Sequence, residues 1–445
     1  MSERDRNEVE YRWSVREHVT LLRFVARWFL ICVPLGLAVG SAVALFLWSL
    51  DRVTQVQWQT PWLLFLLPVA GAVSGLMYRY FGGTAERGNN LILEQIHEPG
   101  GGVPARMAPL VLIGTLITHL FGGSAGREGT AVQMGGSIAS TLGRVLPLKP
   151  HDHSTLLMCG VAAGFGAVFG TPLTGAVFSL EVLAIGVMNY RALIPCLIAG
   201  VIGDQVTTAW GITHTHYLLS FGKTVDGAAG ELLRPALLDG WLVAKVAVAG
   251  ICFGGVSVIF VQLTHGVSAI LKRLVPIAWL RPVVGACGVI LLVWLLGTRD
   301  YLGLGVSGNP NQTRAISIQS CFVVGGVTLL SWWWKSLMTS ITVGSGFKGG
   351  EVTPLFFIGA AAGNILASIM GAPVDLIAAI GFVAVFAGAT NTPVACTIMA
   401  LELFAPHSPD VMRSGFVVYA AIGCFLSYFV SGHSSLYQAQ KVPGT

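Results

Sequence analysis

Long apolar stretches separated by short polar ones dominate the chain. They are Phe29–Leu50, Pro61–Met77, Met107–Phe121, Leu156–Leu180, Leu193–Ile202, Leu242–Phe260, Val283–Leu296, Cys321–Leu330, Leu355–Met370, Leu376–Phe386 and Val417–Val430. A helix of about 20 apolar residues crosses the roughly 30 Å hydrocarbon core of a bilayer. Several stretches are shorter, and many are interrupted by Gly or Pro, which predicts helices that break at membrane depth. Channels and transporters build ion sites from such broken helices.

The composition supports the same class of protein. Of the 445 residues, 54% are hydrophobic and 11% charged, and the mean hydropathy is +0.72, whereas soluble domains carry about 25% charged residues. Strands of an outer-membrane barrel would alternate apolar and polar positions, and these stretches do not. The net charge of +5 is spread between the stretches, so a nucleic-acid partner is not expected. The prediction is an all-α polytopic membrane protein whose partner is the lipid bilayer.

Arginines gather before the first apolar stretch, at positions 4, 6, 12, 16, 23 and 27. Basic residues at the start of a first span favour the cytoplasmic side, so residues 1–20 are expected to form a cytoplasmic segment. A cleavable signal peptide would have a short apolar region and a small-residue cleavage site, and neither is visible.

An internal repeat divides the chain into two halves. Thr171-Pro172 and Leu180-Glu181 recur 221 positions later, as Thr392-Pro393 and Leu401-Glu402, and Gly123-Ser124 recurs at the same offset as Gly344-Ser345. The predicted organisation is a first repeat over residues 21–220, a connecting segment over 221–240 and a second repeat over 241–445. The repeat alone leaves open whether the halves run parallel or inverted.

The segment Gly126-Arg127-Glu128-Gly129 is the strongest candidate for a functional site. Charges at membrane depth are costly and usually functional. Glycines let backbone N–H groups approach a ligand, and a helix N-terminus attracts anions. An ionised Glu128 would block such an anion site, and a protonated Glu128 could swing away and carry a proton. The alternative is a loop outside the membrane with a solvated Arg127–Glu128 pair.

Here the sequence resembles the CLC family of chloride channels and proton-coupled anion antiporters. Gly126–Gly129 is similar to the family's G-[KR]-E-G-P motif, and Gly349-Gly350-Glu351-Val352-Thr353-Pro354 to its G-G-x-F-x-P motif. The segment 162–175 and Leu436-Tyr437 match further family motifs. The resemblance implies a homodimer with about 18 helices per subunit in two inverted repeats, many of them broken or re-entrant. It also implies that Glu128 gates the anion path and that the hydroxyl of Tyr437 contacts the central anion.

The departures from the family pattern are equally informative. Asn89 replaces the anion-binding serine, Thr130 follows the gate in place of proline, and Val182 stands where chloride/proton antiporters keep an internal proton-relay glutamate. Glu351 and Thr353 occupy positions that are usually apolar or small. Together these departures resemble the fluoride-exporting branch of the family.

The substituted residues offer suitable chemistry for a strongly hydrated anion. Asn89 and Asn90 supply amide donors, and Thr353 and Tyr437 supply hydroxyls. A protonated Glu351 could donate a hydrogen bond and carry a proton. The structural alternatives are a buried Glu351 satisfied by a helix N-terminus, and helix capping by Asn89 and Asn90.

The predicted site residues are therefore Glu128 and Glu351 for gating and proton transfer, and a larger set for anion binding. That set is Asn89, Asn90, Gly126, Arg127, Gly129, Val352, Thr353 and Tyr437. Arg127 is expected to pair with a carboxylate or with helix carbonyls rather than with the transported ion. Glu181 and Glu402 are expected to anchor helix ends, His214 and His216 to be exposed loop histidines, and Trp332–Lys335 to lie at the membrane interface.

The predicted function is proton-coupled export of fluoride across the bacterial plasma (inner) membrane. A passive halide channel and a chloride/proton antiporter remain as alternatives, the first disfavoured by Glu351 and the second by Asn89 and Val182. No Ser-His-Asp, metal or phosphate-loop constellation is visible in the sequence, so neither an enzymatic activity nor a cofactor is expected.

Overall fold

A computed structural model describes residues 15–221, 238–310, 315–408 and 415–442. Within these ranges every regular element is a helix, fifteen α-helices and six short 3-10 helices, beside three isolated β-bridges. Most of the expected cytoplasmic segment 1–20 and of the connecting segment 221–240 lies outside the described residues. The all-helical prediction is confirmed over the described ranges.

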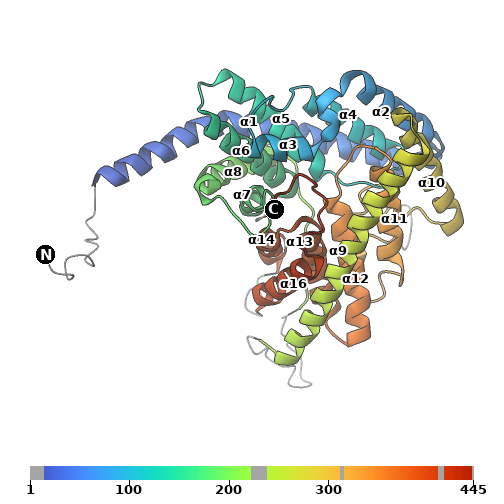
Figure 1. Cartoon of the computed structure of the whole chain (residues 1–445). Helices are drawn as coiled ribbons and strands as arrows, with labels where there is room; N and C mark the ends of the chain where they lie inside the picture. Colours follow the sequence, from blue (N-terminus) through green and yellow to red (C-terminus); the bar gives the residue numbers. More distant parts are fainter. Residues whose placement is uncertain (1–14, 222–237, 311–314, 409–414, 443–445) are drawn as a thin grey trace.

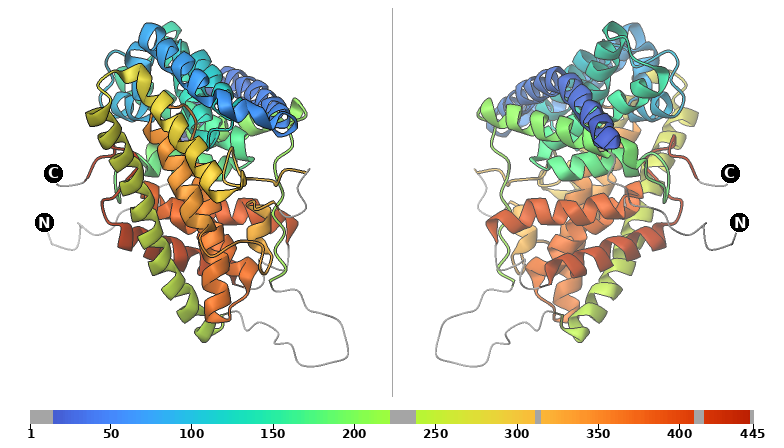
Figure 2. Two further views of the ribbon diagram at one scale, coloured as in Figure 1. Left: turned by 90° about the vertical axis from the view of Figure 1, so that its right-hand side faces the viewer. Right: turned by 90° about the vertical axis from the view of Figure 1, so that its left-hand side faces the viewer.

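Most helices of the first half lie in the upper part of Figures 1 and 2 and most of the second half in the lower part, whereas α10 lies beside α2. The first half holds α1 (Val15–Gln59), α2 (Leu67–Phe81), α3 (Asn89–His97), α4 (Met107–Leu120), α5 (Glu128–Val145), α6 (Pro150–Phe169), α7 (Pro172–Glu181) and α8 (Leu193–Ala209). The second half holds α9 (Gly240–Leu274), α10 (Arg281–Leu296), α11 (Ser331–Gly344), α12 (Val352–Met370), α13 (Val374–Thr390), α14 (Pro393–Phe404) and α16 (Phe416–Ser431). The 3-10 helices are Pro61–Leu66, Gly83–Arg87, Tyr190–Ala192, Ala278–Leu280, Gln319–Phe322 and Ala405–His407.

Seven helical stretches in the described ranges are long and apolar enough to cross a bilayer: His18–Gln59, Pro61–Phe81, Pro150–Phe169, Tyr190–Ala209, Gly240–Leu274, Ala278–Leu296 and Val352–Met370. Four shorter apolar helices, α4, α13, α14 and α16, accompany them. The N-terminal part of α1 projects away from the body (Figure 1). Arg27 on this helix donates to Asp152 of α6 at 2.7 Å, which ties α1 to the first turn of α6.

Two of the apolar stretches are not continuous helices. The stretch Leu156–Leu180 divides between α6 and α7, because Gly170 ends α6 with a φ of 72° and Pro172 begins α7. The same break recurs in the second half, where Asn391 ends α13 with a φ of 57° and Pro393 begins α14. Left-handed backbone stops a helix, and proline is favoured in the first turn of the next. Cys321–Leu330 contributes only the end of the short 3-10 helix Gln319–Phe322.

Two glutamates cap each other's helices across the halves. Glu181, at the end of α7, accepts from the N–H groups of Val394 and Ala395 in the first turn of α14, at 3.0 and 2.8 Å. Glu402, near the end of α14, accepts from the N–H groups of Leu173 and Thr174 at the start of α7, at 2.9 and 2.8 Å. The prediction that both glutamates anchor helix ends is confirmed. Since each helix ends where the other begins, the repeated helices α7 and α14 run antiparallel, as inverted repeats require.

Glycines bring two helix pairs into backbone contact, one pair in each half. A Cβ added to Gly135 of α5 would lie 2.1 Å from the carbonyl oxygen of Gly160 on α6. In the second half, a Cβ on Gly359 of α12 would lie 2.0 Å from the carbonyl oxygen of Gly381 on α13. Small residues at such crossings let membrane helices pack closely. These contacts pack α5 against α6 and α12 against α13. The candidate site lies at the N-terminal ends of α5 and α12.

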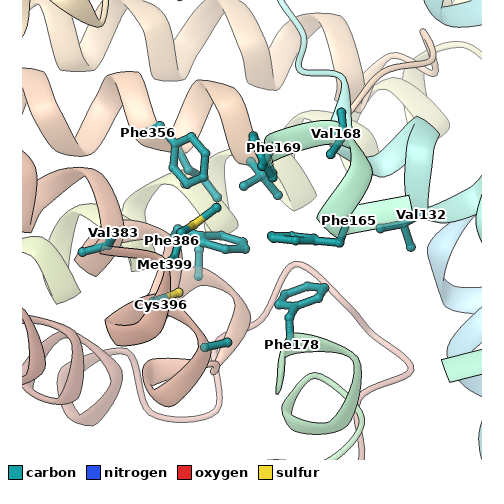
Figure 3. Packing of buried hydrophobic residues seen from close by; sticks show 14 of the residues in the cluster. Val132, Phe165, Val168, Phe169, Phe178, Phe356, Val383, Phe386, Cys396 and Met399 are labelled. Atoms are coloured by element: carbon teal, nitrogen blue, oxygen red, sulfur yellow. The ribbon is translucent and has the colours of Figure 1, made fainter. Parts of the chain in front are cut away.

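Stacked aromatic rings fill the space between the halves (Figure 3). The ring centroid of Phe165 lies 4.6 Å from that of Phe178 and 6.3 Å from that of Phe386, and Phe356 lies 5.3 Å from Phe169. Rings from α6, α7, α12 and α13 therefore form one aromatic cluster that joins the two halves. Aromatic contacts of this kind add about 0.5–1.5 kcal/mol each beyond the burial of their area.

Candidate anion-binding site

The carboxylate of Glu128 lies at the N-terminus of α12. Its Oε1 accepts from the N–H groups of Val352 and Thr353, at 2.5 and 2.9 Å. Its Oε2 accepts from the N–H group of Arg127 and the hydroxyl of Thr353, at 2.9 and 2.7 Å. Glu128 is 1% exposed and itself begins α5, so the start of one helix places its carboxylate on the start of another. A carboxylate in this position occupies a site built for an anion.

Glycines on both sides make room for this carboxylate. The backbones of Gly126 and Gly350 exchange two hydrogen bonds, of 2.6 and 2.8 Å, in an isolated β-bridge that joins the two halves. A Cβ on either glycine would lie 2.3 Å from Oε1 of Glu128. Gly129 packs against Gly350 from the first turn of α5. The N–H group of Gly126, predicted to bind the anion, is thus engaged by Gly350.

Glu351 has no such partners. It is the residue before α12, but its side chain does not cap that helix; the capping carboxylate comes from Glu128. Glu351 is partly exposed, and its carboxylate makes no hydrogen bond to another residue of the described ranges. It lies within electrostatic range of Glu128 and Lys348. The alternative of a buried carboxylate satisfied by a helix N-terminus is therefore not what the structure shows.

Asn89 and Tyr437 line the same small hollow on the other side of the site. The hollow also touches Phe178, Ser179 and Val182, and a volume of only about 10 Å³ in it is free. Oδ1 of Asn89 is buried and has no hydrogen-bond partner. The residue with N-cap geometry at α3 is Gly88 rather than either asparagine, so the capping alternative is wrong. The substituted Asn89 and Val182 thus face one space together with the predicted tyrosine.

Asn90 points elsewhere. Its Oδ1 accepts from the N–H group of Ala439 at 3.1 Å, which fastens the start of α3 to the C-terminal segment that carries Tyr437. The structure therefore gives Asn90 a role in positioning that segment and does not bring its amide to the carboxylate of Glu128.

A wide cavity opens beside the site. It has a volume of about 670 Å³ and is lined by the C-terminal part of α1 and by the segments that follow α8 and α10, with Arg127 and His119 among its lining residues. Arg127 forms no ion pair or side-chain hydrogen bond in the described part of the chain, and its Nε is buried without a partner. The expected pairing of Arg127 with a carboxylate or carbonyls is wrong because its side chain faces this cavity instead.

Long-range packing covers two residues that the sequence does not mark as buried. Lys335, at the end of the segment Trp332–Lys335 predicted to lie at the membrane interface, is fully buried in the protein. Its Nζ donates to the carbonyl oxygens of Tyr301 and Gly303, at 3.1 and 2.8 Å. His214 is not an exposed loop histidine, since its side chain is 17% exposed and its ring packs on Gly170. Neither residue stands in a motif that signals its burial.

The comparisons with known proteins agree with this architecture. The family model for voltage-gated chloride channels matches residues 69–432. A chloride/fluoride channel protein of Pseudomonas syringae pv. tomato is 46% identical over 428 residues, which cover 96% of this chain and 89% of that protein. An H+/Cl− exchange transporter of Yersinia pestis is 27% identical over 67% of this chain and 61% of that protein. The chain therefore belongs to the voltage-gated chloride channel (CLC) family.

Solved structures show the same fold. A CLC-type fluoride/proton antiporter superimposes with a TM-score of 0.83 at 33% identity, covering 94% of this chain and 98% of that one. A slow cyanobacterial Cl−/H+ antiporter superimposes with a TM-score of 0.71 at 18% identity, covering 91% of this chain and 94% of that one. The all-helical membrane fold inferred from the sequence is thus that of the family.

Proposed function

We propose that this protein exchanges fluoride for protons and expels fluoride across the bacterial inner membrane. The observation that carries the proposal is the carboxylate of Glu128, which occupies a helix N-terminus between four hydrogen-bond donors. A fluoride ion can use the same donors once the carboxylate leaves. Because a carboxylate leaves such a site most readily when it is protonated, anion entry and proton binding become linked at one residue.

The relatives support fluoride as the ion. Both the bacterial relative at 46% identity and the solved structure at 33% identity are named for fluoride. Asn89 and Val182, which depart from the chloride/proton antiporter pattern, line one hollow with Tyr437. In the proposal Asn89, Val352, Thr353 and Tyr437 bind the anion, and Glu351 carries the proton on the inner side. The active form is a homodimer with a cytoplasmic N-terminus.

Efflux from liposomes tests the proposal. Purified protein in vesicles loaded with fluoride should release it to an ion-selective electrode while protons enter the vesicles. The second candidate, a chloride channel or chloride/proton antiporter, is supported by the chloride named in several relatives. Release of chloride as fast as fluoride would favour that candidate, and fluoride release without proton uptake would favour a channel.

A further inference from the structure

A second small hollow lies between Glu128 and the wide cavity, and we call it the outer hollow. Its polar lining consists of Arg127, His214, Thr215, Tyr217 and Thr353, and Phe169, Phe356 and Phe382 are among its apolar lining residues. The free volume of the outer hollow is about 10 Å³. This is enough for one particle about the size of a water molecule. Arg127 also lines the wide cavity, and Thr353 also holds Glu128, so the outer hollow adjoins both.

Polar groups in the outer hollow lack partners. Nε of Arg127 and Nε2 of His214 are both buried without a hydrogen bond. Nε2 of His214 lies 3.9 Å from Oδ1 of Asp204, which is beyond hydrogen-bond distance. The hydroxyl of Tyr217 makes no hydrogen bond with the described part of the chain, although the residue is 7% exposed. Buried polar groups without partners are costly, so Nε of Arg127 and Nε2 of His214 require a ligand or a water molecule, to which the hydroxyl of Tyr217 can also bind.

The chemistry of these groups selects an acceptor. The guanidinium of Arg127 is a permanent cation and only donates, and the tyrosine hydroxyl and one imidazole tautomer can donate as well. The hydroxyl of Thr353 is already engaged by Glu128, and Asp204 is not among the lining residues. The nearest carboxylates are that of Glu128, bonded to Thr353, and that of Asp204, 3.9 Å from Nε2 of His214. Neither residue lines the outer hollow, and the donors that do line it fit a small anion better than a cation.

We propose that the outer hollow binds one small anion, of the size of fluoride, on the outer side of Glu128; the choice of fluoride rests on the proposed function. Fluoride is close to water in size, whereas chloride is larger. The ring of Tyr217 is held by Phe382, Phe322 and Phe404, with centroids 5.3, 5.7 and 5.9 Å away. A chloride ion would have to displace these packed rings. The outer hollow therefore discriminates between the two halides by size before the ion reaches Glu128.

Nuclear magnetic resonance can locate the ion directly. The full-length protein is labelled with ¹⁵N-histidine, reconstituted in lipid and equilibrated with fluoride, and the ¹⁹F signal of bound fluoride is examined for dipolar dephasing by histidine nitrogen. The proposal predicts dephasing that disappears in His214→Leu and persists in His433→Leu, since His433 is exposed. Bound fluoride without such dephasing, or dephasing unchanged in His214→Leu, would overturn it and leave water as the occupant.

A transport measurement uses a milder variant that retains the ring packing. Tyr217→Phe removes one hydroxyl and should raise the half-saturating fluoride concentration on the outer side about fivefold, the effect of one net hydrogen bond. The maximal rate and the inner half-saturation should stay unchanged, and Tyr190→Phe, at an exposed tyrosine, should behave as wild type. An unchanged half-saturating fluoride concentration on the outer side would contradict anion binding in the outer hollow. If the wild-type protein moves no fluoride, the proposed function fails. The resonance experiment still decides whether the outer hollow binds fluoride.

Discussion

Four donors converge on the carboxylate of Glu128, and they come from three residues in two segments of the chain. Arg127 belongs to the first half, and Val352 and Thr353 belong to the second. Motif spacing in the sequence was enough to predict Glu128, Val352 and Thr353, because the family motifs lie at helix starts. His214 and Tyr217 were not predicted as site residues, since a loop with no motif brings them to the outer hollow.

Selectivity depends on Asn89 in this account. Asn89→Ser should raise chloride transport relative to fluoride, because a shorter side chain widens the hollow that Asn89 shares with Tyr437. A tenfold change in the ratio corresponds to about 1.4 kcal/mol, comparable to one or two net hydrogen bonds. Parallel flux measurements with both halides on the purified variant check this. An unchanged ratio would move the selectivity to Thr353, Tyr437 or the outer hollow.

Glu351 is the candidate for the inner proton step. Its carboxylate makes no hydrogen bond to another residue of the described ranges, so Glu351→Ala should leave the fold intact and slow fluoride/proton exchange at least tenfold. Glu98→Ala, at an exposed side chain, is the matched control and should exchange at the wild-type rate. Wild-type exchange by a folded Glu351→Ala protein would show that another group carries the proton.

The repeated helices show how far the sequence predicts elements. The offset of 221 positions predicted two related halves, and the structure places the two Thr-Pro pairs at corresponding points, immediately at the starts of α7 and α14. The direction of the two halves could not be read from that repeat alone. It follows from the contacts of Glu181 with α14 and of Glu402 with α7, which only the folded chain brings together.

These reciprocal caps should matter equally for stability. Glu181→Ala and Glu402→Ala each leave two N–H groups at a helix start without their carboxylate. Hydrogen bonds to a charged group contribute about 1.5–3 kcal/mol each, so both variants should unfold at clearly lower temperature. Thermal unfolding of the purified proteins measures this, with Glu86→Ala at an exposed position as the control. A loss of stability in one variant alone would contradict the symmetric arrangement.

The glycine crossings allow a sharper test at the same scale. Gly160→Ala and Gly381→Ala would each place a Cβ within 2.4 Å of a carbonyl oxygen on the facing helix, so both should prevent folding or greatly lower the yield of folded protein. Gly266→Ala on α9, where an added Cβ meets nothing within 4 Å, should be tolerated. Size-exclusion chromatography of the three variants compares them. Normal folding of Gly160→Ala would mean that α5 and α6 are farther apart than described.

For the whole molecule, the decisive feature is that the site is shared between the halves. The bridge between Gly126 and Gly350 and the hydrogen bonds from Val352 and Thr353 to Glu128 all cross from one half to the other. Composition and apolar stretches predicted a membrane protein, and the motifs predicted its family. The contacts that join the halves at the site could be found only from the folded structure, because the bonded residues lie 224 and 225 positions apart in the sequence.

Uphill transport driven by a pH difference tests the central claim most directly, that Glu128 couples the fluoride and proton movements. Wild-type protein in liposomes should move fluoride against its gradient when only a proton gradient is imposed. Glu128→Gln, whose amide cannot release a proton, should lose this uphill movement while remaining folded. Wild-type accumulation of fluoride by the Glu128→Gln protein under the same gradient would contradict the account.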